Sequence, residues 1–201
     1  MTTPHNRRQF LAYGVATLAS LSTPAWSAPR RYNLSARNAT IGFDFSLSGV
    51  RQNGSAPLKS ADLRIDVKNL AASQATVTAD ISRAKTGFIF ATDALKSASV
   101  LDTANHPTAS FRSTKVTLGS NGRLSEGATL AGELTLRGVT RTVRFDAALY
   151  RPAGSAADSL DQLEVHLKGA INRNDFGATG YPDLVDPIVG LNIRAEIAVS
   201  E

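Results

Sequence analysis

The chain has 201 residues, no cysteine and a formal net charge of +5, to which Arg7 and Arg8 contribute two charges. The lack of cysteine excludes disulfides, thiol chemistry and cysteine-bound zinc. The basic excess is mild and is not gathered into the patch or stripe that nucleic-acid-binding proteins carry, so we expect no nucleic-acid partner.

The chain is expected to begin with a signal peptide, residues 1–27, that is removed on export. Arg7 and Arg8 form a positive start, residues 10–21 are apolar and uncharged, and cleavage is expected after Ser27. About a dozen apolar residues are too few to span a bilayer as a helix, which disfavours the alternative of an uncleaved anchor. Residues 6–11 resemble a twin-arginine export motif, which favours that route over general secretion. The expected location is the periplasm.

The remaining residues, 28–201, are expected to form one domain in which apolar and polar side chains alternate. The apolar members of the four clearest segments are Ile41, Phe43, Phe45 and Leu47; Leu63, Ile65 and Val67; Leu163, Val165, Leu167 and Ile171; and Leu191, Ile193, Ala195, Ile197 and Val199. This period of two is typical of antiparallel strands with one face in water. No segment here is apolar and long enough for a spanning helix, so no stable membrane insertion is expected.

Residues that favour turns separate these strands. We expect turns at Gln52–Ser55 and Ser120–Gly122, which both contain Asn-Gly, and a loop at Pro152–Ser155. The segment Thr179–Asp183 interrupts the alternation before the last strand and is also expected to be a loop. One short helix is expected at Thr92–Leu101, capped by one of its first two residues.

The segment Leu134–Phe145 predicts a β-hairpin. Leu134 and Leu136 alternate with polar residues before Gly138, and Val143 and Phe145 alternate with polar residues after it. Gly138 is free to adopt the positive φ that a tight turn between paired strands requires.

About eight strands with one continuous apolar face can form either a sandwich of two sheets or a closed barrel. The alternation alone does not separate these two folds. Closure removes exposed sheet edges, and an eight-stranded barrel has room for one ligand. A strand of about ten residues is roughly 33 Å long, so such a barrel would take an extended chain lengthwise.

Several segments resemble the YceI-like family of secreted, lipocalin-like barrels. The stretch Leu134–Phe145 resembles the family's signature LTIRGVTKPV, and the run Gly132–Thr140 is the most specific part of the resemblance. The other matching segments are Tyr32 with Ile41–Phe43, Ala61–Asp66, Leu95–Ser97 with Leu101–Asp102, His106–Pro107 with Phe111, Arg173–Gly177, and Val189–Ile193. The resemblance implies an all-β, antiparallel lipocalin-like β-barrel of about eight strands with one short helix. It also implies a bound isoprenoid lipid, of polyprenyl or quinone type.

The chain departs from the family pattern in two respects. Many members have His-Ser and a further histidine in or just after the first strand, where this chain has Asn38-Ala39 and Leu47-Ser48. Thr142 stands where proline is common. A role of those histidines toward a ligand head group is therefore in doubt here, whereas the alternation that builds the barrel is intact.

The resemblance implies that inward side chains line a lipid cavity. These are Ile41, Phe43, Phe45, Phe111, Leu134, Val143, Phe145 and Ile193. Burial of a hydrocarbon tail there would be worth about 0.8 kcal/mol per methylene. The alternative is a dry core filled by these side chains themselves, which would suit a stress-linked or protein-interaction domain.

Five further residues are candidates for the mouth of the cavity: Phe88, Phe90, Arg137, Arg141 and Arg173. The two phenylalanines lie beside the expected helix, and the arginines could meet a phosphate or a quinone ring. For the first two arginines the alternative is a solvated outer face. For Arg173 it is an ion pair with Asp175 or a clamp on a loop.

No catalytic motif is visible in the sequence. His106 and His166 are far apart and have no nearby histidine or cysteine, so no metal is expected. A glycine-rich phosphate loop, a Gly-x-Ser-x-Gly elbow and a His-Glu-x-x-His motif are all lacking. We expect a binding protein without a cofactor, an enzyme that acts on isoprenoid lipid being the weaker alternative. A homodimer is left open.

Overall fold

The computed structural model describes residues 29–66, 68–119, 127–156 and 159–200. Its strands are β1 (Arg30–Leu47), β2 (Val50–Ala56), β3 (Leu58–Ile65), β4 (Gln74–Asp80), β5 (Lys85–Thr86), β6 (Thr108–Leu118), β7 (Ala128–Leu136), β8 (Val139–Tyr150), β9 (Gln162–Asn172) and β10 (Ile188–Val199). One α-helix, α1 (Ile89–Lys96), and 3-10 turns at Leu70–Ala72, Ile81–Arg83 and Arg173–Phe176 complete this part of the chain. The expected signal peptide and the expected Ser120–Gly122 turn lie outside the described residues.

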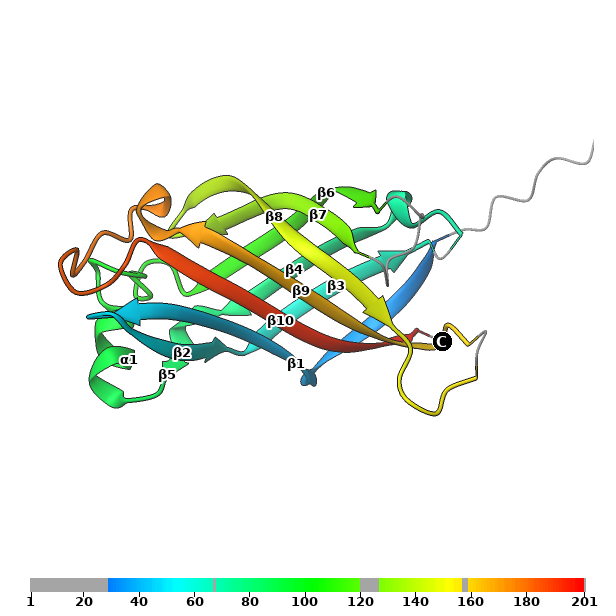
Figure 1. Ribbon diagram of the computed structural model, residues 1–201, viewed down its shortest axis with the longest axis horizontal. Coiled ribbons are helices and arrows are strands. Elements are labelled where there is room, and N and C mark those ends of the chain that lie inside the picture. The colour runs from blue at the N-terminus through cyan, green and yellow to red at the C-terminus, as the bar shows by residue number, and fades with distance from the viewer. Residues whose placement is uncertain (1–28, 67, 120–126, 157–158, 201) are drawn as a thin grey trace, which may run out of the picture.

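Eight of the strands close into an antiparallel barrel (Figure 1). Their order is β10-β9-β8-β7-β6-β4-β3-β1, and β1 pairs with β10 to complete the circle. The long strand β1 serves two neighbours on its other side, because Arg30–Tyr32 pair with β3 and Ile41–Leu47 pair with β2. The expectation of a barrel with one short helix is confirmed, and the sandwich is excluded.

The predicted apolar faces point into this barrel. Ile41 lies opposite Ile193, and Phe43 lies opposite Leu191, where β1 meets β10. All four side chains face the interior, whereas Asp44, the residue after Phe43, is on the outer face, where it forms an ion pair with Arg51. A period of two thus directs every second side chain of each strand into the barrel.

The expected turn at Gln52–Ser55 is wrong, because these residues belong to β2. The chain reverses earlier, at Ser48 and Gly49, whose φ values are 51° and 80°. Two positive φ values form the two-residue turn that suits the twist of paired strands. The glycine in the Asn-Gly pair has another use. Gly54 lies opposite Phe43 and leaves room for its ring.

The expected helix is shifted toward the amino terminus. Helix α1 spans Ile89–Lys96, so Thr92 lies inside it and does not cap it. The Thr92 hydroxyl instead accepts a hydrogen bond from the backbone N–H of Thr86, at 3.0 Å, and thereby joins α1 to β5. The helix ends early because Ser97 is extended and its hydroxyl donates to the carbonyl of Ala94. The loops expected at Pro152–Ser155 and Thr179–Asp183 are confirmed.

The β7–β8 hairpin is confirmed, with Arg137 and Gly138 as its two turn residues at φ values of 52° and 74°. We expect Gly138→Val to lower the melting temperature by several degrees. A β-branched residue at positive φ costs about 1–3 kcal/mol, and an added Cβ would lie 3.0 Å from the ring of His106. Thermal unfolding followed by circular dichroism measures the change. Asparagine tolerates this backbone conformation, so Gly138→Asn should lower the melting temperature less than Gly138→Val does. Equal melting temperatures for the native protein and both variants would contradict this account of the turn.

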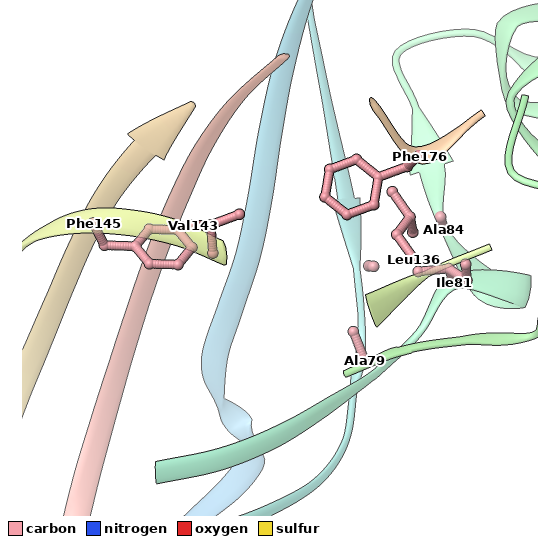
Figure 2. Close-up of a cluster of buried hydrophobic side chains, with 8 residues drawn as sticks. Ala79, Ile81, Ala84, Leu136, Val143, Phe145 and Phe176 are labelled. Atoms are coloured by element: carbon pink, nitrogen blue, oxygen red, sulfur yellow. The ribbon is translucent and has the colours of Figure 1, made fainter. Parts of the chain in front are cut away.

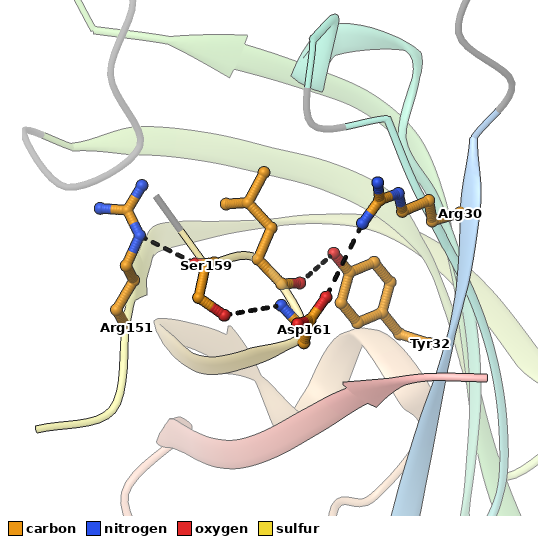
Figure 3. Close-up of polar contacts among 6 residues, drawn as sticks. Arg30, Tyr32, Arg151, Ser159 and Asp161 are labelled. Atoms are coloured by element: carbon orange, nitrogen blue, oxygen red, sulfur yellow. Dashed lines mark hydrogen bonds and ion pairs between the residues drawn. The ribbon is translucent and has the colours of Figure 1, made fainter. Parts of the chain in front are cut away.

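The end of the barrel at which β10 finishes contains a buried cluster. Tyr32, Leu63, Leu163 and Ile197 form it, from β1, β3, β9 and β10. Burial raises the pKa of the Tyr32 phenol, which donates a 2.7 Å hydrogen bond to the carbonyl of Leu160 (Figure 3). The loop between β8 and β9 is thus fastened to β1.

Candidate functional site

The barrel encloses a cavity of about 550 Å³, which is within the usual range for small-molecule sites. Aliphatic and aromatic side chains from the strands, from α1 and from the loop before β10 make up most of its wall. The polar side chains on the wall are few: Ser73, Gln74, Ser110, Ser113, Arg173 and Tyr181. Such a wall can hold a hydrocarbon chain and offers little to a charged ligand.

The structure brings most of the predicted cavity residues together on this wall. Seven of the eight line it: Ile41, Phe43, Phe45, Phe111, Leu134, Phe145 and Ile193. Val143 does not. It is 7% exposed and is buried in a cluster with Phe145, Leu136 and Phe176 (Figure 2). Its placement on the cavity wall was therefore wrong, because neighbouring side chains cover it.

The aromatic side chains of the wall form two pairs. The rings of Phe43 and Phe45 stack on β1 with their centroids 6.3 Å apart. Phe111 of β6 and Phe145 of β8 meet edge to face at 5.4 Å. These two strands flank β7, which is the fourth strand from β1 in either direction around the eight-stranded barrel. The pairs therefore lie on opposite walls of the cavity.

Most of the large exposed apolar residues lie in or beside α1, the turn between β1 and β2 and the segment that leads into β10. These segments lie together at one end of the barrel (Figure 1). Seven of the eight large exposed hydrophobic residues of the described chain are there: Val50, Phe88, Ile89, Phe90, Tyr181, Leu184 and Ile188. Four of them, Phe88, Phe90, Tyr181 and Leu184, also line the cavity. Because Phe90 is 82% exposed and still lines the cavity, the cavity reaches the surface at this end.

Arg173 lies between this rim and the barrel interior and is only 6% exposed. Its guanidinium donates to four backbone carbonyl oxygens, those of Ala178, Gly180, Val185 and Asp186, at 2.6–3.1 Å. Burial lowers the pKa of Arg173, although an arginine remains protonated near neutral pH. Arg173 is thus a clamp on the loop before β10, which is one of the two alternative roles that the sequence analysis gave for it. No ion pair with Asp175 occurs within the described part of the chain.

The other two arginines predicted at the mouth do not line the cavity. Arg137 donates to the carbonyls of Ala98 and Val100, at 2.6 and 2.9 Å, and so holds the segment that follows α1. Arg141 is exposed, and its one side-chain hydrogen bond within the described residues goes to the carbonyl of Thr140. Arg137 is turned away from the cavity because it is a turn residue. Arg141 pairs with Leu134 and shares the phase of Val143 and Phe145, but it lies only three residues after the turn and is exposed there.

The histidines lie apart from the cavity. The Nε2 atom of His166 is 3.6 Å from the Glu164 carboxylate, and His106 lies against the Gly138 turn. In residues 29–66, 68–119, 127–156 and 159–200, no three histidine or carboxylate side chains are grouped to hold a metal ion. None of the helices within those ranges has the length and apolar character to cross a membrane.

The sequence analysis did not identify every residue of the wall, and two groups show why. Ala91 and Leu95 line the cavity from α1, and Tyr181 and Leu184 line it from the loop that Arg173 clamps. The sequence signal for the first two was the apolar face of a helix, which was misplaced by three residues. Tyr181 and Leu184 lie in an irregular segment, where no periodicity shows which side chains point inward.

The chain is similar to known proteins over most of its length. The family model of the YceI-like domain matches residues 32–199. A UPF0312 protein of Vibrio cholerae is 26% identical over 186 residues, which cover 89% of this chain and 95% of the relative. A UPF0312 protein of Vibrio parahaemolyticus is 28% identical over 142 residues, or 70% of this chain and 73% of that protein.

Solved structures share the fold. BcnA of Burkholderia cenocepacia matches with a TM-score of 0.70 at 16% identity, over 82% of this chain and 99% of BcnA. A polyisoprenoid binding domain from Saccharophagus degradans, implicated in plant cell wall breakdown, matches with a TM-score of 0.57 at 13% identity, over 87% of this chain and all of that domain. A Campylobacter jejuni YCEI protein matches with a TM-score of 0.56 at 20% identity, over 94% of this chain and 99% of that protein.

Proposed function

The chain belongs to the YceI-like domain family, and we propose that it is a binding protein or carrier for a long isoprenoid lipid, of polyprenyl or quinone type, held in the barrel. The observation that carries the proposal is the apolar cavity, whose wall continues into an exposed apolar rim. An interior that a protein merely packs for stability needs no apolar route to the surface. The fold shared with a polyisoprenoid binding domain supports the same ligand class.

The proposed function is binding and not catalysis. The family and the fold relatives favour a binding protein. The cavity wall offers no pair of a nucleophile and a base, because its polar side chains are two serines of β6, a serine and glutamine at the start of β4, an arginine and a tyrosine. The arginine is already engaged by four carbonyl groups. The chemistry available is therefore burial of a hydrocarbon tail, worth about 0.8 kcal/mol per methylene.

We place the entrance at the α1 end of the barrel. Phe88 and Phe90 flank it on one side, and Tyr181 and Leu184 flank it on the other. These side chains would contact the tail as it leaves a membrane or another carrier, so that it need not cross open water. The head group would remain at this rim, beside the carbonyl-rich loop that Arg173 organises.

We further propose that residues 28–201 act in the periplasm after removal of the signal peptide. The paired arginines Arg7 and Arg8, followed by an uncharged apolar stretch, support export. Fractionation of cells that express the full chain tests this, and the processed protein is expected in the periplasmic fraction. Precursor that stays in the cytoplasm without processing would contradict it.

Native mass spectrometry of protein purified from the periplasm tests the proposed function. We expect a species heavier than the processed chain by the mass of one isoprenoid lipid, and collisional activation should release that lipid for identification. The same preparation extracted with organic solvent serves as the lipid-free control. A chain that is always found bare, even when purified without detergent from cells rich in quinone, would indicate a self-filled core and would overturn the carrier function.

A further inference from the structure

We propose that three glycines in the barrel wall determine which chain the cavity accepts, because each provides a seat in which a phenylalanine ring lies against the wall. The pairs are Gly54 with Phe43, Gly132 with Phe111, and Gly169 with Phe145. This inference rests on the proposed function and deepens it, because it concerns the width of the cavity and the kind of tail that the width selects.

The first seat is on β2. Gly54 pairs directly with Phe43 of β1, so both would project side chains to the same, inner face. A Cβ added at Gly54 would overlap the Phe43 ring, which therefore lies over the glycine. The ring also stacks on Phe45, and so is held flat along this side of the barrel.

The other two seats are on β7 and β9, and the rings that lie in them come from β6 and β8. Gly132 of β7 lies beneath the Phe111 ring, which a Cβ there would overlap. Gly169 of β9 pairs with Phe145, and a Cβ there would lie 2.8 Å from the Cδ1 atom of that ring. The two rings then meet edge to face.

The lining of the cavity agrees with this arrangement. Each of the three phenylalanines lines the cavity, whereas Gly54, Gly132 and Gly169 do not, because the rings cover them. A side chain at any of the three positions would push its ring toward the opposite wall. Since the rings lie on opposite walls, each displacement would narrow the same lumen.

A narrower lumen would discriminate between two kinds of hydrocarbon chain. An isoprenoid chain carries methyl branches at regular intervals, whereas a straight saturated chain is slimmer along its whole length. A packed interior resists added volume, so a branched chain should be excluded first. The glycine seats thus favour branched, isoprenoid tails.

The experiment compares geranylgeraniol, which is branched, with eicosanol, a straight chain of equal carbon number. Binding of each alcohol to delipidated full domain is measured by displacement of a fluorescent hydrophobic probe. In Gly132→Ala, geranylgeraniol should bind at least tenfold more weakly, while eicosanol should change much less. The matched control is Gly190→Ala, whose added methyl would lie nearest the Asp44 carboxylate on the outer face, and both affinities should persist.

Gly132→Ala also brings a methyl to 2.5 Å from the carbonyl oxygen of Arg112, which will reduce stability by itself. The double variant Gly132→Ala, Phe111→Leu keeps that strain and removes the ring, so it should regain geranylgeraniol binding. Phe111→Leu alone empties the seat without touching the backbone, and should raise the preference for geranylgeraniol even if Gly132→Ala does not fold. A preference that is unchanged in Phe111→Leu, or affinities that fall equally for both alcohols in Gly132→Ala, would overturn the inference. Native protein that binds neither alcohol would instead overturn the proposed function.

Discussion

Arg173→Leu is expected to destabilise the domain by about 3–5 kcal/mol. The substitution removes the partner of four backbone carbonyl oxygens and leaves them in a site from which the arginine excludes water. An unsatisfied buried acceptor costs about 1–3 kcal/mol, and part of that cost is relieved where the loop can move toward solvent. Urea unfolding followed by circular dichroism gives the change in free energy.

Two comparisons make this test specific. Arg173→Lys keeps the charge, but a lysine has its three donors on one atom and cannot reach all four carbonyls. The free energy of unfolding of this variant should lie between those of the native protein and Arg173→Leu. Arg141→Leu removes an exposed arginine whose side chain donates to the carbonyl of the adjacent residue, and should change stability by less than about 0.5 kcal/mol. If Arg173→Leu proved no worse than Arg141→Leu, Arg173 would not be the clamp that the structure indicates.

The loop that Arg173 clamps carries Tyr181 and Leu184, which line the cavity. Removal of the Arg173 side chain should therefore also disturb the cavity rim. An Arg173 variant that still folds but has a loosened loop should therefore exchange lipid faster than the native protein. The sequence could not reveal this role. The Arg-x-Asp-Phe-Gly run identified Arg173, but four acceptors that are backbone carbonyls leave no trace in residue type.

The strands were the predictable part of the fold, because burial of one face forces a period of two on every strand. Ile41, Phe43 and Phe45 pointed inward as expected, and so did Ile193 across the β1–β10 seam. Closure into a barrel was not contained in the alternation, which suits a sandwich equally well. It was the family resemblance that favoured the barrel over the sandwich.

The errors have local physical causes. Asn53-Gly54 has the composition of a turn, but Gly54 is needed under the Phe43 ring, and the turn is formed at Ser48 and Gly49 instead. Val143 has the correct inward phase, yet its neighbours cover it. Period and residue type therefore predict which way a side chain points, whereas contact with the lumen depends on the sizes of side chains on adjacent strands.

Phe43→Asp is expected to abolish lipid retention while the barrel remains folded. Phe43 lines the cavity and stacks on Phe45, so an aspartate would place a carboxylate against the hydrocarbon tail. Burial of that charge costs several kcal/mol unless water or a partner reaches it. In a cavity that a ligand fills, the lipid leaves and water enters, so the cost falls on binding and not on folding. Circular dichroism reports the fold, and solvent extraction with mass spectrometry reports the lipid.

Phe43→Leu is the matched variant, because it shortens the same side chain without adding charge. It should keep a bound lipid, although the emptied seat over Gly54 would change which tails fit. Loss of lipid in Phe43→Asp alone would therefore locate the effect in polarity and not in lost volume. The opposite result is equally clear. If Phe43→Asp fails to fold and the native protein never carries lipid, the interior is a packed core whose phenylalanines stabilise the barrel, and the carrier function falls.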